Sequence, residues 1–181
     1  MTLKKNLPLT AHQLKKMMPY ARLTKIELFL EPLNLAMEKY QINTPLRIAA
    51  FLAQITHESG SLNYVKELAS GRAYEWRRDL GNTVSGDGPR FKGRGLIQIT
   101  GRSNYKACGE ALGLDLLTWP ERLEEPLAAC LSAAWFWHSH GLNELADVEE
   151  FDAITKRING GYRGKIERDT FYEANKKFLG V

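Results

Sequence analysis

The 181-residue sequence has few of the features that mark secreted or membrane proteins. It contains only two cysteines, Cys108 and Cys130, which are too few for a disulfide framework, so we expect both to be reduced packing residues. No apolar run approaches the roughly 20 residues that a membrane-spanning helix needs. Lys4 and Lys5 are not followed by the apolar stretch of about 7–15 residues of a signal peptide, so the sequence predicts synthesis and retention in a cytoplasm.

Charge of neither sign dominates, since 25 Lys and Arg against 21 Asp and Glu leave a net charge of +4. A mildly basic chain suits an anionic partner such as nucleic acid or a bacterial wall, without choosing between them. Hydrophobic residues make up 44%, enough for a compact core. Because no repeat or linker interrupts the chain, we expect one domain over 1–181, with a helical N-terminal part at 1–44 and a core at 45–178.

Helix start and stop signals dominate the chain. Thr10 with Gln13 and Thr24 with Glu27 have the spacing of capping boxes. Apolar residues recur at helical spacing in several windows, each bounded by Pro or Gly. These patterns predict helices over about 26–40, 45–58, 126–140, 148–158 and 165–178.

Residues 69–95 are rich in Gly, Arg and polar side chains and show no sustained apolar period. Loops of this length in a compact domain are usually functional or disordered. Tyr74, Trp76 and Phe91 are interspersed, which favours an ordered wall facing a substrate. A short strand is predicted over 96–100, so the expected fold class is mainly α with one small β element.

Glu58 is the first candidate for chemistry. It lies seven residues after Phe51 and three after Ile55, so it continues the apolar stripe of its predicted helix. Burial and the negative end of the helix dipole both favour a neutral carboxylic acid there. Such an acid can protonate a leaving oxygen, as glycoside hydrolysis requires. Periodicity alone still favours a helix-terminal glutamate that points into solvent.

Glycoside hydrolysis needs a second carboxylate, and Glu67 is nine residues further on. On one straight helix the two would be roughly 13 Å apart. A turn at Gly60 would shorten this toward the roughly 6.5–9.5 Å that leaves room for a water between the carboxylates. Glu75 competes for the role, and the spacing does not choose between them.

Other chemistries match the sequence less well. His57 and Glu58 begin like a zinc-protease motif, but position 61 is Ser instead of the second His. His138 and His140 bracket a serine near a helix end and lack an acidic or Cys partner at ligand spacing, which favours a surface pair over a metal site. We therefore expect no metal and no cofactor.

Three segments taken together are highly specific: FLAQITHESGSLNYVKE at 51–67, GPRFKGRGLIQITGRSNY at 88–105, and INGGY followed by ERDTFY within 158–172. They resemble the family 19 glycoside hydrolases, which include chitinases and many phage endolysins, over roughly 45–178. The resemblance implies a lysozyme-like helical fold with two lobes and a central substrate cleft. It also implies an inverting mechanism, in which water attacks the anomeric carbon directly.

The same resemblance implies roles for nine side chains. Glu58 matches the general acid, Glu67 the general base, and Thr100 the residue that helps hold the attacking water. Arg168 resembles the arginine that is linked to the catalytic carboxylates, and His57 lies beside the acid. The other four match residues that line the sugar-binding cleft: Gln98, Asn104, Tyr105 and Asn159.

The chain departs from the secreted plant-type chitinases in its missing signal, its few cysteines and its lack of a carbohydrate-binding module. It looks more like a phage endolysin, which implies a monomer that hydrolyses the peptidoglycan bond between N-acetylmuramic acid and N-acetylglucosamine. Such an enzyme accumulates in the bacterial cytoplasm and reaches the periplasm and wall through a separate pore protein. The alternatives are a chitinase, or a non-catalytic wall-binding or nucleic-acid-binding module that uses loop 72–94. The paired glutamates argue against that module, so no nucleic-acid partner is expected.

Overall fold

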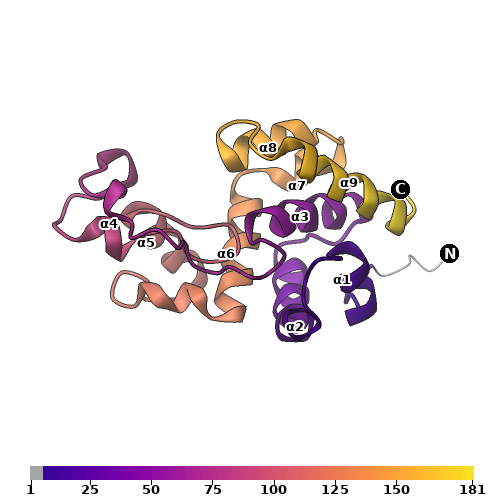
Figure 1. Cartoon of the computed structure of the whole chain (residues 1–181), viewed down its shortest axis with the longest axis horizontal. Coiled ribbons are helices and arrows are strands. Elements are labelled where there is room, and N and C mark those ends of the chain that lie inside the picture. The colour runs from indigo at the N-terminus through magenta and orange to yellow at the C-terminus, as the bar shows by residue number, and fades with distance from the viewer. Residues whose placement is uncertain (1–5) are drawn as a thin grey trace.

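The computed structural model describes residues 6–181, so Lys4 and Lys5 lie outside the described residues. Within this range the chain forms nine α-helices and three short 3-10 helices, and it contains no β-strand. Figure 1 shows two lobes, one made by α1–α3 and α7–α9 and the other by α4, α5 and long loops, with α6 between them. The predicted class, a mainly α fold with two lobes, is confirmed.

The helices have the following bounds: α1 Ala11–Met17, α2 Leu23–Lys39, α3 Pro45–Glu58, α4 Asp87–Arg90, α5 Arg102–Leu112, α6 Pro126–Ser139, α7 Leu142–Asp147, α8 Phe151–Asn159 and α9 Lys165–Leu179. The 3-10 helices are η1 Arg72–Tyr74, η2 Arg78–Leu80 and η3 Pro120–Glu124.

Helix α3 forms the centre of the larger lobe. Its start is set by Thr44, whose side chain accepts a hydrogen bond from the backbone N–H of Arg47, and by Pro45 at the first helical position. All residues from 48 to 56 are buried, so this helix is covered on every side along most of its length. It packs against α9, which brings the end of α3 beside a helix more than 100 residues later in the chain.

The N-terminal part is packed into the same lobe. Helix α2 lies against α6, and α1 contacts α2, α3 and α9. The predicted capping box of Thr10 and Gln13 is present. The one predicted for Thr24 and Glu27 is wrong, because α2 already begins at Leu23 and is preceded by Arg22 without a side-chain cap. Because Thr24 is inside the helix, the N–H of Glu27 faces the carbonyl of Leu23 four residues earlier and is not free to bind the Thr24 hydroxyl.

The strand predicted over 96–100 is also wrong. The backbones of Arg94 and Ile99 exchange two hydrogen bonds of 3.1 and 2.8 Å across a tight turn. Gly95 and Gln98 have φ values of 82° and 60° within that turn, and this left-handed backbone cannot continue as a strand. The β element is reduced to two isolated bridges, Lys66 with Arg94 and Arg94 with Ile99.

The predicted long loop is ordered by short helical turns and by one buried carboxylate. Asp87 accepts hydrogen bonds from the backbone N–H groups of Thr83 and Val84, both at 3.0 Å. The Arg102 guanidinium donates two more, of 2.9 and 2.6 Å. The guanidinium, helped by the amides, holds the pKa of Asp87 below its usual value although burial opposes this shift. The loop therefore has an internal anchor in the absence of an apolar stripe.

Both cysteines are buried and unpaired. Burial raises their pKa, to about 12 for Cys108, so the thiolate form that reacts with oxidants is disfavoured. In residues 6–181, no helix combines the length and the apolar character needed to cross a membrane.

Candidate active site

The chain reverses direction directly after Glu58. Gly60, Ser61 and Leu62 have φ values of 55°, 60° and 65°, three consecutive residues in the left-handed region. The Ser59 hydroxyl accepts a 2.8 Å hydrogen bond from the N–H of Leu62, which secures the turn. The predicted turn at Gly60 is therefore present, and Glu67 does not continue the helix that carries Glu58.

Glu58 meets a buried cation from α9. Arg168, with a side chain 1% exposed, places Nη2 at 2.5 Å from Oε1 of Glu58, whose side chain is 19% exposed. A buried guanidinium is tolerated only where charge and hydrogen bonds compensate it. No other hydrogen bond reaches the Glu58 side chain within residues 6–181, so its second oxygen has no hydrogen-bond partner there.

Sequence reasoning missed the rest of the network around Arg168. Its guanidinium also donates to the side-chain oxygen of Gln54 and, at 3.1 Å, to the carbonyl of Arg163. Gln54 in turn donates a 2.9 Å hydrogen bond to the buried hydroxyl of Thr155. A polar Gln54 inside the apolar run of α3 was the available signal, since a buried amide needs partners.

His57, next to Glu58 in the chain, also contacts α9, but at Glu167 instead of Arg168. Its Nδ1 contacts the carboxylate of Glu167, which is exposed. Its ring lies against Gly164, where an added Cβ would come within 2.2 Å of the ring. The glycine therefore provides the space that lets the imidazole sit at this helix junction.

Glu67 is held from two directions. Its carboxylate accepts hydrogen bonds from the Tyr74 hydroxyl at 3.2 Å and from the backbone N–H of Gly93 at 3.1 Å. Burial, followed by the charge of Glu67, raises the pKa of Tyr74, so this hydroxyl stays a donor. A Cβ added at Gly93 would lie 2.8 Å from the side-chain oxygen of Gln98 and 3.2 Å from a carboxylate oxygen of Glu67, so the glycine leaves room for both side chains.

The competitor, Glu75, is used by the loop itself. Its two oxygens accept hydrogen bonds of 2.7 and 2.8 Å from the backbone N–H groups of Gly86 and Gly88. The backbone of Glu75 also lies close to Gly88: a Cβ added at Gly88 would come within 2.6 Å of the Glu75 nitrogen. The geometry therefore favours a structural role for Glu75 and leaves Glu67 as the candidate base.

Gln98, Thr100 and Asn104 line one hollow of about 160 Å³ between the lobes. The Thr100 hydroxyl donates to the carbonyl of Gln98 at 2.9 Å, and Asn104 donates to the carbonyl of Thr100 at 2.8 Å. Gln98 has a φ of 60°, a backbone conformation that costs free energy for a residue with a side chain. The structure thus brings these three predicted residues together on a strained turn.

Tyr105 and Asn159 are placed differently. Tyr105 is fully buried, and its hydroxyl donates to the Lys92 carbonyl at 2.6 Å and accepts from Arg94 at 3.0 Å. As a correction to the predicted cleft contact, its side chain is core that supports the wall, and burial raises its pKa. Asn159 is exposed at the end of α8, directly after Ile158, which lines the hollow.

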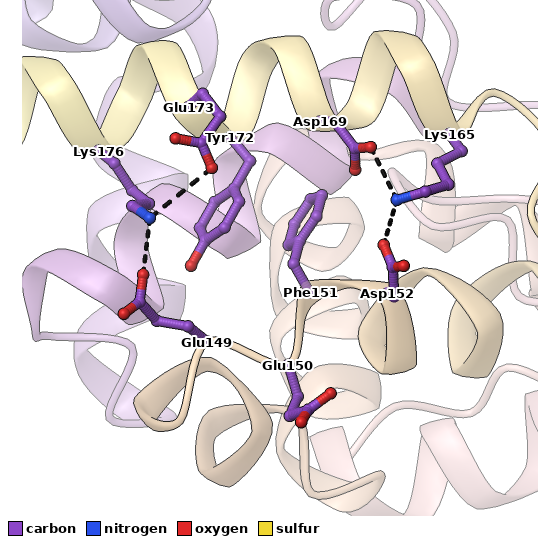
Figure 2. Close-up of a pocket in the computed structure, with 9 residues that line it drawn as sticks. All are labelled: Glu149, Glu150, Phe151, Asp152, Lys165, Asp169, Tyr172, Glu173 and Lys176. Carbon is purple, nitrogen blue, oxygen red and sulfur yellow. Dashed lines mark hydrogen bonds and ion pairs between the residues drawn. The ribbon is translucent and has the colours of Figure 1, made fainter.

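A second hollow, of about 490 Å³, lies between α9 and residues 149–152 and contains none of the predicted site residues. Figure 2 shows two lysines bridging its carboxylates. Lys165 pairs with Asp152 and, at 2.8 Å, with Asp169. Lys176 pairs with Glu149 at 2.6 Å, and also with Glu173. Glu150 is a fifth carboxylate in the lining and makes no ion pair among the described residues, so negative charge is in excess here. Because none of the predicted site residues reaches this hollow, we interpret it as an acidic packing seam.

The chain is similar to known proteins in sequence and in structure. The family model for glycoside hydrolase family 19, described as chitinase class I, matches residues 41–146. A glycosyl hydrolase family 19 domain-containing protein of Haemophilus influenzae is 35% identical over 176 residues, which cover 80% of this chain and 86% of that protein. An endochitinase of Arabidopsis thaliana is 43% identical over 115 residues, which cover 63% of this chain but only 39% of the plant protein.

Two solved structures superpose on nearly the whole chain. A bacterial family 19 chitinase superposes with a TM-score of 0.79 at 26% identity, covering 95% of both chains. Chitinase C from Streptomyces griseus superposes with a TM-score of 0.75 at 25% identity, covering 95% of this chain and 76% of that one.

Proposed function

The chain belongs to glycoside hydrolase family 19, and on that premise we propose that it hydrolyses β-1,4 bonds in a polymer of N-acetylglucosamine with inversion at the anomeric carbon. The observation that carries the proposal is the Glu58 carboxylate, bound through one oxygen to a buried guanidinium at the end of α3. The similar plant and bacterial proteins are named as chitinases, which favours chitin over the peptidoglycan expected from the sequence.

In this mechanism Glu58 is the general acid. Its unbonded oxygen carries the proton and transfers it to the oxygen of the leaving sugar as the glycosidic bond breaks. The carboxylate that results is already paired with Arg168, so the negative charge formed in the reaction is stabilised where it appears. Gln54 and Thr155 keep the guanidinium in place through buried hydrogen bonds.

Glu67 is the proposed general base. It accepts a proton from a water molecule as that water attacks the anomeric carbon from the face opposite the leaving group. The Tyr74 hydroxyl and the Gly93 N–H orient its carboxylate. Thr100, on the neighbouring turn, is proposed to help hold the same water. The proton count balances, since Glu58 loses one proton and Glu67 gains one.

Peptidoglycan is the competing substrate, because it contains the same type of bond and a net charge of +4 suits an anionic wall. A lytic role, a monomeric state, a bacterial cytoplasmic location and passage through a pore protein are further proposals that depend on this substrate.

Incubation with chitin oligomers and with purified peptidoglycan tests the proposal. We expect reducing ends from the chitin oligomers, with the α-anomer formed first as followed by NMR. Muropeptides analysed by mass spectrometry would reveal the bond cut if peptidoglycan is the better substrate. Activity on neither polymer, or an initial β-anomer, would overturn the proposal.

A further inference from the structure

The two histidines at the end of α6 occupy different surroundings. His138 packs beside Tyr40, with ring centroids 5.9 Å apart, and does not line the hollow that holds Gln98. His140 does line that hollow, together with Gln98, Thr100 and Asn104. A pair that looks equivalent in the sequence is therefore divided by the fold, and only one member faces the predicted substrate residues.

His140 is held in one orientation. Its ring stacks on Phe136, with centroids 3.8 Å apart and planes inclined by 20°. Its Nδ1 lies 2.8 Å from the Phe136 carbonyl and 3.1 Å from the Ser139 hydroxyl. A carbonyl oxygen only accepts, so Nδ1 carries the hydrogen and Nε2 of the neutral ring presents a lone pair. Arg157 donates to the His140 carbonyl at 2.8 Å and fixes the backbone there.

The hollow itself combines apolar walls with neutral polar groups. Its apolar members are Leu80, Ile97, Ile99, Trp135, Phe136 and Ile158. Among the described residues, no Asp, Glu, Lys or Arg side chain lines it. Its volume of about 160 Å³ is small beside the roughly 300–1,000 Å³ of a drug-sized pocket, so it suits a substituent of a sugar better than a whole sugar ring.

We propose that His140 is a specificity-determining contact whose Nε2 accepts a hydrogen bond from the acetamido N–H of a sugar, with the acetyl methyl group packed in this hollow. The inference rests on the proposed function, because it assigns a contact within the same cleft. An acetamido group matches the hollow, since it is uncharged and combines an N–H donor, a carbonyl acceptor and an apolar methyl. Loss of the acceptor leaves the N–H of a bound sugar without a partner.

The test compares His140→Ala and His140→Gln with His138→Ala as the matched control. With N-acetylglucosamine oligomers, we expect KM to rise about five- to tenfold for His140→Ala, the size of one hydrogen bond, with kcat changed less than twofold. His140→Gln, which keeps an acceptor, should recover part of the loss. If His140→Ala has the same KM as His138→Ala, the inference is wrong. Thermal unfolding of all three variants checks that each is folded.

A binding assay separates this inference from the proposed function. Tryptophan fluorescence is followed while the native chain and its His140 variants are titrated with N-acetylglucosamine oligomers and with their deacetylated counterparts. Weaker binding of acetylated oligomers on loss of His140, without any hydrolysis by the native chain, would support the inference and reject the function. Hydrolysis with the same rate and KM in the native chain and the His140 variants would support the proposed function and reject the inference. Absence of binding to acetylated oligomers would also reject the inference.

Discussion

Helix α9 carries cations on two of its faces, and the two sets differ in burial. Arg168 is 1% exposed and meets Glu58 on α3, whereas the Lys165 side chain is 38% exposed and bridges Asp152 and Asp169. Exposed pairs contribute about 0–1 kcal/mol each, because water screens both charges. A buried cation that loses its partner costs far more, about 3–5 kcal/mol.

The difference also separates the hollow of Figure 2 chemically from the pair of Glu58 and Arg168. In the hollow of Figure 2, each lysine joins two carboxylates, and Glu150 adds a fifth carboxylate without an ion pair among the described residues. At the other face of α9, Arg168 binds one oxygen of Glu58 and the second oxygen has no hydrogen bond within the described residues. The larger hollow is the weaker candidate site, because it contains none of the residues that the sequence motifs single out.

The largest effect is expected at the acid. Glu58→Gln keeps the shape of the side chain and removes the proton donor, so hydrolysis should fall about 100- to 10,000-fold. Initial rates of reducing-end release measure the loss, and circular dichroism checks that the helices remain. A variant with near-native rates would remove Glu58 from the mechanism and end the contrast between the buried pair and the hollow of Figure 2.

A comparison of two glutamates gives the next largest effect. Glu67→Gln should lower the rate about 100-fold or more with little change in unfolding temperature. Glu75→Gln should instead weaken the loop by about 1–3 kcal/mol, because one of the Gly86 and Gly88 amides loses an acceptor. Rates and thermal unfolding measured on both variants separate the roles. Activity lost only in Glu75→Gln would transfer the role of base to that residue.

Arg168→Met tests the buried side of α9. It leaves the Glu58 carboxylate and the Gln54 amide without their cation, so the free energy of unfolding should fall by about 3–5 kcal/mol. Calorimetry should show a drop in Tm of about 6–20 °C, at roughly 2–4 °C per kcal/mol for a chain of this size. A change within 2 °C would mean that the pair is not buried in solution.

Asp87→Asn tests the loop anchor and has a defined pH dependence. The folded pKa of Asp87 is lowered by Arg102, so its stabilisation is complete above the unfolded value of about 4 and is lost as the pH falls through the lower folded value. At pH 7 the variant should be about 1–3 kcal/mol less stable in urea. Near pH 3 the difference should shrink, and a difference independent of pH would contradict this account.

The smallest effect is expected on the exposed face of α9. Lys165→Met, the partner experiment to Arg168→Met, should change stability by less than about 1 kcal/mol. Hydrolysis should be unchanged, and the small stability difference should decrease at 1 M salt. A loss of activity comparable to that of Arg168→Met would show that the hollow of Figure 2 belongs to the active site.

Much of the local structure could be predicted because it depends on neighbouring residues. The cap at Thr44, the proline at position 45 and the turn at Gly60 bound α3 as expected. The strand over 96–100 failed, because Gly95 and Gln98 adopt a left-handed backbone that the apolar letters around them do not reveal. Ile166, in the helix predicted over 165–178, is 85% exposed, because apolar spacing does not tell which residues of a helix another element covers.

The site divides in the same way. The chain by itself determined the family, the helix that ends in Glu58 and the turn that redirects Glu67, because these depend on motifs and on local backbone preferences. The family resemblance also implied that Arg168 lies at the carboxylates, and the structure places it against Glu58. Only the tertiary structure decided that Gln54 and Thr155 support Arg168, that Tyr105 is core, and that His140 and not His138 faces the hollow. Burial and hydrogen-bond partners between distant segments are set by how α3, α6 and α9 pack, which no local pattern records.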